Sequence, residues 1–366
     1  MKHLEEYRDA ELSKILIEKI KATVTQPWAI MEICGGQTHS LVRNGILGLL
    51  PKEIQMVHGP GCPVCVTPQH MIDRAIELAQ TPGVILASFG DMLRVPGNHG
   101  SLLKAKANGG DVRVVYSPLE AVEIAKREPQ REVVFFAVGF ETTAPANALA
   151  ILQADSLGLK NFSLLASHVL VPPAMEAILG AGDNIIQGFL AAGHVCTVMG
   201  TEEYHAVAER FQVPVVITGF EPVDLLRGIL KLVEMLESDD HSVQNAYARV
   251  VRLDGNPQAR KNLSSVFEVI DKDWRGIGQI PGSGLGIRQE FAKYDAIQKF
   301  QLRFDEEIHH NGCRAGEVLR GALKPDQCPF FGKQCTPLNP MGAPMVSSEG
   351  ACSAYYHYQI EPSHAE

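Results

Sequence analysis

A short apolar run followed by a helical pattern recurs from Trp28 to about Leu236, and this alternation constrains the fold more than any other feature. WAIMEICGG precedes QTHSLVRNGILGLL, VVFFAVGF precedes ETTAPANALAILQA, and VPVVITGF precedes EPVDLLRGILKLVEML. Strands that alternate with helices form mostly parallel sheets with helices on both faces. The sequence therefore predicts an α/β fold built from Rossmann-like parallel-sheet domains.

The pattern changes after Glu237, where charged residues become more frequent and clear strands fewer. From Cys313 the chain is rich in Cys, Gly and Pro, which is typical of a fold fixed by a metal rather than by a large core. A chain of 366 residues is long enough for two or three compact units. We expect the following division: an N-terminal helix in 1–29 that packs on the C-terminal part, α/β domains over 30–128 and 129–240, and a Cys-rich domain over 241–366.

Composition excludes several classes of protein. The formal net charge is -9 and no basic block is present, so nucleic acid is not an expected partner. The polar, acidic start lacks the features of a signal peptide, and no apolar run is long enough to span a bilayer, so we expect a cytoplasmic protein with no membrane contact. In that reducing compartment, clustered cysteines indicate metal or redox chemistry more often than structural disulfides. The absence of a P-loop means that no ATPase activity is predicted.

The first candidate site is the CGGQTH segment, which begins at Cys34. Cys34 is predicted at the carboxyl end of a strand, where ligands bind in open α/β sheets. The N-terminus of the following helix would favour the thiolate, and two glycines would let a ligand approach the backbone. His39 could serve as a proton donor or a ligand. The alternative is a buried cysteine beside a tight turn.

The second candidate site is the HGPGCPVC segment, which contains Cys62 and Cys65. A CxxC pair can form a reversible disulfide or supply half of a zinc site, and the chain has no second CxxC. We therefore favour a redox dithiol over zinc, with a purely structural turn as the third possibility. Thr67 and Pro68 are predicted as the N-cap and first residue of the next helix, which would lower the pKa of the Cys65 thiol.

A third group of polar residues follows strand-like runs in the middle of the chain. Glu141 could hold a charge or relay a proton in a cleft, whereas Thr142 or Thr143 could simply cap the next helix. His194 follows a strand-like run in the same way, although a lone histidine is more often structural than catalytic.

The last candidate site is a C-terminal set of cysteines: Cys313, Cys328, Cys335 and Cys352. Four thiolates suit an iron–sulfur cluster or a tetrahedral zinc ion, and the wide spacing does not choose between the two. Nearby aromatic residues such as Phe330 and Tyr355 could shield the site from solvent, although aromatics in a small core are the default.

Taken in order, CGGQTH, HGPGCPVC, GFETT, GHVxTVxG and CPFFGKQCTP…MVSSEGAC closely resemble the HypD family of [NiFe]-hydrogenase maturation factors along essentially the whole chain. The resemblance implies three α/β-type domains around a central cleft and a [4Fe–4S] cluster in the C-terminal region. It also implies a scaffold on which the Fe(CN)₂CO group is assembled on iron. The implied partners are HypC and the cyanide donor HypE, with HypF upstream.

The same resemblance assigns roles to individual residues. Cys34 is similar to the family's iron-binding cysteine, which shares the iron with a cysteine of HypC, and Cys62 and Cys65 are similar to its redox pair. The GFETT segment, with Glu141, and the His194 region are similar to the motifs that line the cleft. Many family members have a second cysteine at the position of Ala315, so Cys313 must substitute for it or the cluster loses one ligand.

The function predicted from the sequence is therefore a scaffold for assembling Fe(CN)₂CO, in which Cys34 binds iron. The Cys62 and Cys65 pair and the cluster would supply redox function, and the sequence leaves open whether the protein is itself an enzyme. The alternative is a thiol–disulfide oxidoreductase with a structural zinc site.

Overall fold

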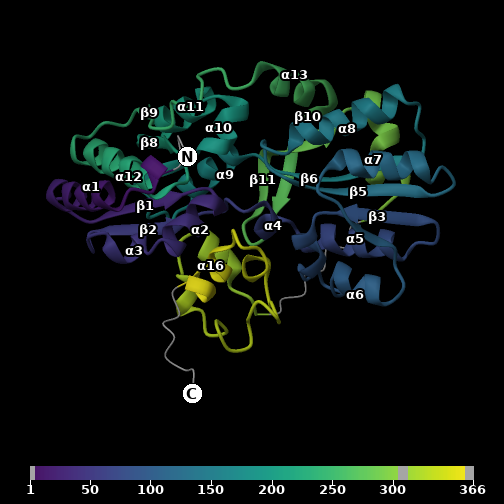
Figure 1. Ribbon diagram of the computed structural model, residues 1–366, viewed down its shortest axis with the longest axis horizontal. Coiled ribbons are helices and arrows are strands. Elements are labelled where there is room, and N and C mark those ends of the chain that lie inside the picture. Colours follow the sequence, from purple (N-terminus) through teal and green to yellow (C-terminus); the bar gives the residue numbers. More distant parts are fainter. Residues whose placement is uncertain (1–4, 304–311, 359–366) are drawn as a thin grey trace.

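The computed structural model describes residues 5–303 and 312–358 and contains two parallel sheets (Figure 1). Sheet A has the strand order β2-β1-β7-β8-β9 and sheet B the order β4-β3-β5-β6. The strands of sheet A are β1 (Trp28–Glu32), β2 (Ile54–His58), β7 (Gly188–Ala192), β8 (Val215–Thr218) and β9 (Val243–Asn245). Those of sheet B are β3 (Val84–Ser88), β4 (Val112–Val114), β5 (Glu132–Gly139) and β6 (Phe162–His168). Every strand pair within the two sheets is parallel, which confirms the predicted α/β class.

Helices cover both faces of each sheet. The α-helices within residues 10–266 are α1 (Ala10–Thr23), α2 (Gly35–Arg43), α3 (Ile46–Leu49), α4 (Pro63–Val66), α5 (Gln69–Gln80), α6 (Leu102–Ala107), α7 (Pro118–Arg127), α8 (Ala144–Ser156), α9 (Val171–Leu179), α10 (Gly193–Met199), α11 (Glu202–Phe211), α12 (Pro222–Glu237) and α13 (Pro257–Val266). Successive side chains of a strand point to opposite faces. In β5, Phe135 packs in the core shared with α7 and α8, and Phe136 packs in the core shared with α5 and α6. Central strands buried on both faces explain the continuous apolar runs in the sequence.

The two sheets do not follow the domain boundaries expected from the sequence. Sheet A combines strands from before residue 59 with strands from after residue 187, and sheet B contains all the strands between them. The expected boundary between 128 and 129 falls inside sheet B, between α7 and β5. The cause is that β7 pairs with β1, with Ile30 opposite Gly188, so the chain returns to the first sheet after completing the second.

The N-terminal helix packs elsewhere than expected. Helix α1 contacts α12, and its apolar residues Leu16, Ile17 and Ile20 lie in the core of sheet A rather than on the C-terminal part. Asp9 caps the helix by accepting hydrogen bonds from the backbone of Glu11 and Leu12. The apolar stripe of α1 therefore completes the sheet A layer.

The helix start predicted after the CxxC segment lies at another residue, whereas α7 begins in the usual way. Ser117 caps α7 and Pro118 is its first residue. Helix α5 instead begins at Gln69, and Thr67 ends the short helix α4, where its hydroxyl donates to the carbonyl of Pro63 at 2.9 Å. The CxxC segment therefore forms a helical turn of its own.

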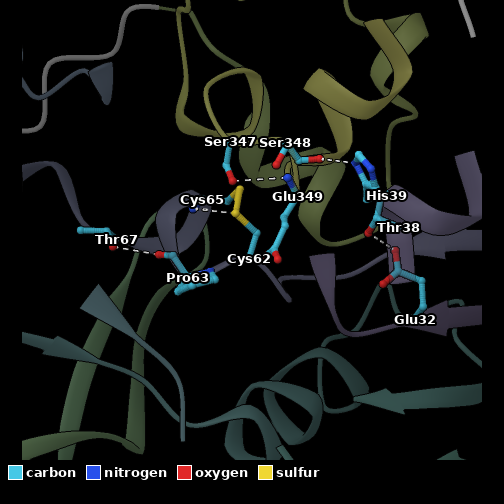
Figure 2. The surroundings of a disulfide bond; sticks show 10 residues. All are labelled: Glu32, Thr38, His39, Cys62, Pro63, Cys65, Thr67, Ser347, Ser348 and Glu349. Atoms are coloured by element: carbon cyan, nitrogen blue, oxygen red, sulfur yellow. Dashed lines mark hydrogen bonds between the residues drawn. A yellow bond between two sulfur atoms is a disulfide. The ribbon is translucent and has the colours of Figure 1, made fainter. Parts of the chain in front are cut away.

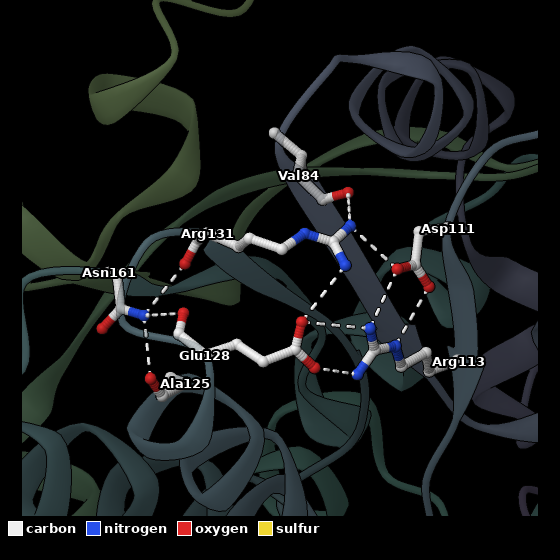
Figure 3. A network of polar contacts seen from close by, with 7 residues as sticks. All are labelled: Val84, Asp111, Arg113, Ala125, Glu128, Arg131 and Asn161. Carbon is white, nitrogen blue, oxygen red and sulfur yellow. Dashed lines mark hydrogen bonds and ion pairs between the residues drawn. The ribbon is translucent and has the colours of Figure 1, made fainter.

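A polar network fixes the ends of strands and helices in sheet B (Figure 3). The Asn161 side-chain amide donates to the carbonyls of Ala125, Glu128 and Arg131 at 2.9–3.1 Å. The Arg113 guanidinium bonds to both Asp111 and Glu128 and lowers the pKa of each carboxyl group. These contacts tie the loops before β4, β5 and β6 together.

An antiparallel hairpin, β10 (Phe267–Trp274) and β11 (Gly278–Ile287), follows the sheets and was not predicted. It lies beside β6, with Val169 bridged to Gly284, and the Leu170 backbone amide donates to the Ser283 carbonyl at 2.8 Å. The remaining described chain has short elements: α14 (Ala296–Lys299), α15 (Ala315–Leu319) and α16 (Ala351–Tyr358), with 3₁₀ turns at Glu5–Tyr7, Gly90–Arg94, Gln289–Tyr294, Pro325–Gln327 and Ala343–Met345. Helix α16 packs on α2, which places the C-terminal segment beside sheet A (Figure 1).

Candidate functional site

Cys34 lies where strand β1 ends and helix α2 begins, as the sequence predicted. It occupies the N-cap position, and its carbonyl accepts hydrogen bonds from the amides of Gln37 at 2.8 Å and Thr38 at 3.1 Å. Its side chain is partly buried and is not in a disulfide. The turn therefore fixes the position of a thiol at the carboxyl end of a parallel strand.

The acidity of Cys34 differs from the prediction. Burial raises the pKa of the Cys34 thiol to about 12, and the carboxyl groups of Glu349 and Glu32 add to the rise. Backbone amides of Gly36 and Gln37 act in the opposite direction but are outweighed. The helix N-terminus alone does not produce a thiolate here because desolvation and two acidic neighbours disfavour the negative charge.

Cys62 and Cys65 form a disulfide within the turn of α4, with their Cα atoms 5.2 Å apart. Both side chains are buried, and the Cys65 amide lies 3.3 Å from the Cys62 sulfur. The two cysteines of the CxxC segment are thus joined to each other, and the redox role predicted for them stays a prediction.

Glycines bring the Cys34 turn, the disulfide and the C-terminal segment into contact. Figure 2 shows the disulfide beside Ser347 and Glu349 of that segment. A Cβ on Gly61 would lie 2.3 Å from the Cys34 backbone nitrogen, and a Cβ on Gly35 would lie 2.6 Å from the Glu349 Cβ and 3.2 Å from the Cys62 Cβ. The Gly35 amide also donates to the Gly61 carbonyl at 3.0 Å. The sequence suggested that the glycines admit a ligand, but at Gly35 and Gly61 they admit other parts of the chain.

His39 lies on the first turns of α2 and faces the C-terminal segment. Its Nδ1 is 2.9 Å from the Ser348 carbonyl, which can only accept, so Nδ1 carries the proton in this contact. The ring also meets Tyr358 edge-on, with the centroids 5.4 Å apart. His39 therefore joins α2 to the Ser347–Glu349 segment beside Cys34 (Figure 2).

A buried polar network that the sequence analysis missed lies directly behind Cys34. The Glu32 carboxylate accepts from the Cys34 amide at 3.0 Å, from the Thr38 hydroxyl, and from His58 Nδ1 at 2.8 Å. His58 Nε2 lies 3.0 Å from the Tyr355 hydroxyl. Burial raises the pKa of Glu32, and the hydrogen bond from His58 is the largest opposing effect. One acidic residue in the apolar run WAIMEIC was the available signal.

Aromatic side chains form a wall on the other side of Cys34. A Cβ on Gly36 would lie 3.2 Å from the Phe220 ring and 3.8 Å from the Cys34 sulfur, so the ring and the thiol flank the same glycine. His194 stacks on Phe220 with ring centroids 3.8 Å apart, and burial lowers the pKa of His194. The structure therefore places the apolar ring of Phe220 near the thiol, with the neutral imidazole of His194 stacked on it. Phe220 was not among the predicted site residues.

Glu141, Thr142 and Thr143 lie at the end of β5 in sheet B, whereas Cys34 lies in sheet A. Glu141 is fully buried and accepts a hydrogen bond from the Val171 amide at 2.8 Å. Burial raises the pKa of Glu141 to about 8. Thr143 holds the N-cap position of α8, but its side chain makes no capping bond and its hydroxyl lies 3.4 Å from the Phe140 carbonyl.

The C-terminal cysteines come together around one small apolar pocket, which is lined by Cys313, Cys328, Cys335 and Cys352 with Arg314, Ala315, Val318, Phe330, Phe331, Met341 and Met345. Burial raises the pKa of the Cys352 thiol, and the three other cysteines add to the rise. Ala315 lies on the pocket wall together with Cys313, so Cys313 reaches the site from two residues earlier in the chain.

Four thiols around one apolar pocket are a donor set of the kind that holds an iron–sulfur cluster or a tetrahedral zinc ion. Within 5–303 and 312–358, no group of three or more His, Cys, Asp or Glu side chains is placed to hold one metal ion.

The chain is an α/β protein with two parallel sheets. It has a cysteine outside any disulfide at a strand end, a CxxC disulfide and a pocket lined by four cysteines. A family model described as HypD, hydrogenase formation hypA family, matches residues 11–359. Hydrogenase maturation factor HypD2 of Bradyrhizobium diazoefficiens is 49% identical over 371 residues, with 98% of this chain and 97% of the relative covered. The HypD proteins of Azotobacter vinelandii (98% and 97% covered) and Escherichia coli K12 (all of both chains covered) are 47% and 44% identical. The chain belongs to the HypD family of hydrogenase maturation factors.

Among the residues that the structure describes, no helix combines the length and the apolar character that crossing a bilayer requires.

Proposed function

We propose that this protein is the scaffold on which the Fe(CN)₂CO group of a [NiFe]-hydrogenase is assembled, with iron bound at Cys34. The observation that carries the proposal is the packing of the Cys34 turn directly against the loop of the Cys62–Cys65 disulfide, through Gly35 and Gly61. A metal-binding thiol beside a two-electron thiol pair is the arrangement that such an assembly requires.

The surroundings of Cys34 suit an iron that carries cyanide and CO. Such an iron prefers soft donors, and a thiolate is one. Because the pKa of the free thiol is about 12, iron binding must displace the thiol proton, so loading of Cys34 releases a proton. The stacked rings of Phe220 and His194 limit water on one side of the thiol.

The disulfide contributes redox capacity of its own. Reduction of Cys62–Cys65 takes up two electrons and two protons, and reoxidation returns them. In the cytoplasm, where we place this protein, a disulfide is usually redox-active rather than structural. We assign Cys62 and Cys65 as the redox pair that serves iron-ligand assembly.

The four C-terminal cysteines would hold a [4Fe–4S] cluster, with Cys313 as the fourth ligand in the absence of a cysteine at Ala315. The support is their common apolar pocket. Such a cluster supplies one-electron transfer when bound. The apolar walls from Phe330, Phe331 and Met345 would restrict solvent access to the cluster.

The partners follow from family membership. We propose that a HypC-type protein contributes a second cysteine to the iron and that a HypE-type protein, supplied by HypF, delivers cyanide. His194, which is exposed, is proposed to line a central cleft where these partners act, whereas Glu141 is fully buried and would act only on the shape of its surroundings. His39, held against the Ser348 carbonyl, is proposed to maintain the wall of the Cys34 site.

Infrared spectroscopy tests the central assignment. The protein is co-expressed with HypC-, HypE- and HypF-type partners and isolated without oxygen. We expect stretching bands of bound cyanide and CO in the wild type and their loss in Cys34→Ala, because the soft donor to iron is gone. Cys196→Ala is the matched control, because Cys196 is also outside any disulfide but is fully buried and hydrogen-bonded with Tyr204, and it should keep the bands.

Retention of the bands in Cys34→Ala would remove Cys34 from the iron site. The second candidate function, a thiol–disulfide oxidoreductase with a zinc site, is favoured by the disulfide alone. A wild-type complex that shows no cyanide or CO bands but catalyses disulfide exchange would support that second function.

A further inference from the structure

Glu32 receives hydrogen bonds from the two loops that carry the first three cysteines. Its carboxylate accepts from the Cys34 amide at 3.0 Å, and its backbone carbonyl accepts from the Gly59 amide at 2.9 Å, three residues before Cys62. The same carboxylate accepts from His58 Nδ1 at the end of β2. One residue therefore fixes the position of the Cys34 turn relative to the disulfide loop.

His58 extends this connection to the C-terminal segment. Because Nδ1 donates to the Glu32 carboxylate, Nε2 of a neutral imidazole accepts, and the Tyr355 hydroxyl donates to it at 3.0 Å. The Tyr355 ring also meets the imidazole edge-on, with centroids 5.3 Å apart. The three side chains form an unbroken chain from phenol to imidazole to carboxylate.

Tyr355 lies on the helix that carries a cysteine of the four-cysteine pocket. Helix α16 contains both Cys352 and Tyr355, which lie three residues apart and hence on neighbouring positions of the helix surface. The helix packs on α2, which begins directly after Cys34. The chain of hydrogen bonds thus joins the position of Cys352 to the position of Cys34.

Burial makes this network of three hydrogen-bonded side chains sensitive to the loss of a single atom. Glu32, His58 and Tyr355 are respectively 0%, 4% and 4% exposed, so water cannot replace a missing partner. Removing one partner leaves a buried polar atom unsatisfied, and such losses are felt through the whole network.

We propose that Glu32, His58 and Tyr355 are positioning residues that fix the Cys34 turn relative to both the disulfide loop and the helix that carries Cys352. The proposal rests on hydrogen-bonded geometry in the protein without iron, and only its use in iron capture depends on the proposed function. A displacement of α16 would be transmitted to the Cys34 amide through Tyr355, His58 and Glu32 in turn.

Hydrogen–deuterium exchange of the isolated protein, resolved by peptide, tests the proposal. Tyr355→Phe keeps the ring and removes the hydroxyl. We expect exchange in 33–38 to become about tenfold faster, because His58 Nε2 loses its donor and the Glu32 contacts loosen. Tyr356→Phe on the same helix is the matched control: Tyr356 is only partly buried, its ring meets Phe331, and exchange in 33–38 should stay at the wild-type rate.

A double-mutant comparison separates positioning from general destabilisation. If Tyr355 acts through His58, Tyr355→Phe should add no further acceleration in a His58→Gln background. Additive effects, unchanged exchange in 33–38, or an equal acceleration of the β5 and β6 peptides would each overturn the proposal. Because no iron is involved, these outcomes are independent of the infrared test.

Discussion

At the scale of single residues, close contacts decide what Cys34 can do. The residue type and its place before a helix suggested an acidic thiol, but burial with Glu349 and Glu32 nearby raises its pKa instead. The same crowding explains the glycine at Gly61, whose missing side chain leaves room for the Cys34 backbone. Only the folded structure shows which groups approach the thiol, because Glu349 is more than 300 residues away in the sequence.

Substitution of Gly61 should therefore be costly. A Cβ in Gly61→Ala would lie 2.3 Å from backbone atoms of Ile33 and Cys34, which cannot rotate away. We expect a loss of at least about 2 kcal/mol in the free energy of unfolding, measured by urea denaturation.

Gly48→Ala provides the comparison for that experiment. Gly48 is exposed in α3 and a Cβ there meets no atom within 4 Å, so the substitution should stabilise the protein by up to about 1 kcal/mol through helix propensity. Equal effects of the two substitutions would contradict the steric explanation.

At the scale of elements, the same tripeptide has different roles at two strand ends. Gly139-Phe140-Glu141 begins at the last residue of β5 and Gly219-Phe220-Glu221 follows β8, so both lie between a strand and a helix. Glu141 is buried and accepts from the first residue of α9, whereas Glu221 holds the N-cap position of α12 without a side-chain capping bond and pairs with Arg8. The environment of each strand end, rather than the motif, decides whether the carboxyl group is buried.

The buried carboxyl of Glu141 should make stability depend on pH. Its folded pKa of about 8 lies above the unfolded value near 4.3, so the folded state binds the extra proton between these values and stability falls as pH rises through them. In Glu141→Gln this contribution disappears, and the fall in the free energy of unfolding from pH 6 to pH 8 should be smaller than in the wild type. Urea denaturation at pH 6, 7 and 8 measures the slope, and an unchanged slope would show that Glu141 does not titrate in this range.

At the scale of the whole molecule, the chain leaves sheet A after β2, completes sheet B, and returns to sheet A at β7. The β10–β11 hairpin then packs beside β6 (Figure 1). Its Trp274 lies in the core that also contains Phe189 of sheet A and Phe140 beyond β5. The Trp274 indole donates to Ser283 at 2.9 Å inside the hairpin. The hairpin therefore links the two sheets through one shared core.

Loss of the indole should weaken this link. Trp274 is 1% exposed, and Trp274→Ala should lower the free energy of unfolding by about 3–5 kcal/mol through lost burial and a cavity. Val269→Ala on the same hairpin strand is the control, because Val269 is 62% exposed and its truncation should cost less than about 0.5 kcal/mol. Urea denaturation followed by circular dichroism measures both, and a small effect of Trp274→Ala would show that the hairpin is not part of the shared core.

The sequence by itself determined the α/β class, several of the buried strands, the Cys62–Cys65 pair and the position of Cys34 at a strand end. These features depend on local periodicity and on spacing of a few residues, which a sequence displays directly. Only the tertiary structure decided that β7 returns to β1, that α1 packs on α12, and that Glu32, His58 and Tyr355 connect three distant segments. These features depend on which buried groups meet across the fold, and burial and proximity between distant residues are set by the packing of the whole chain.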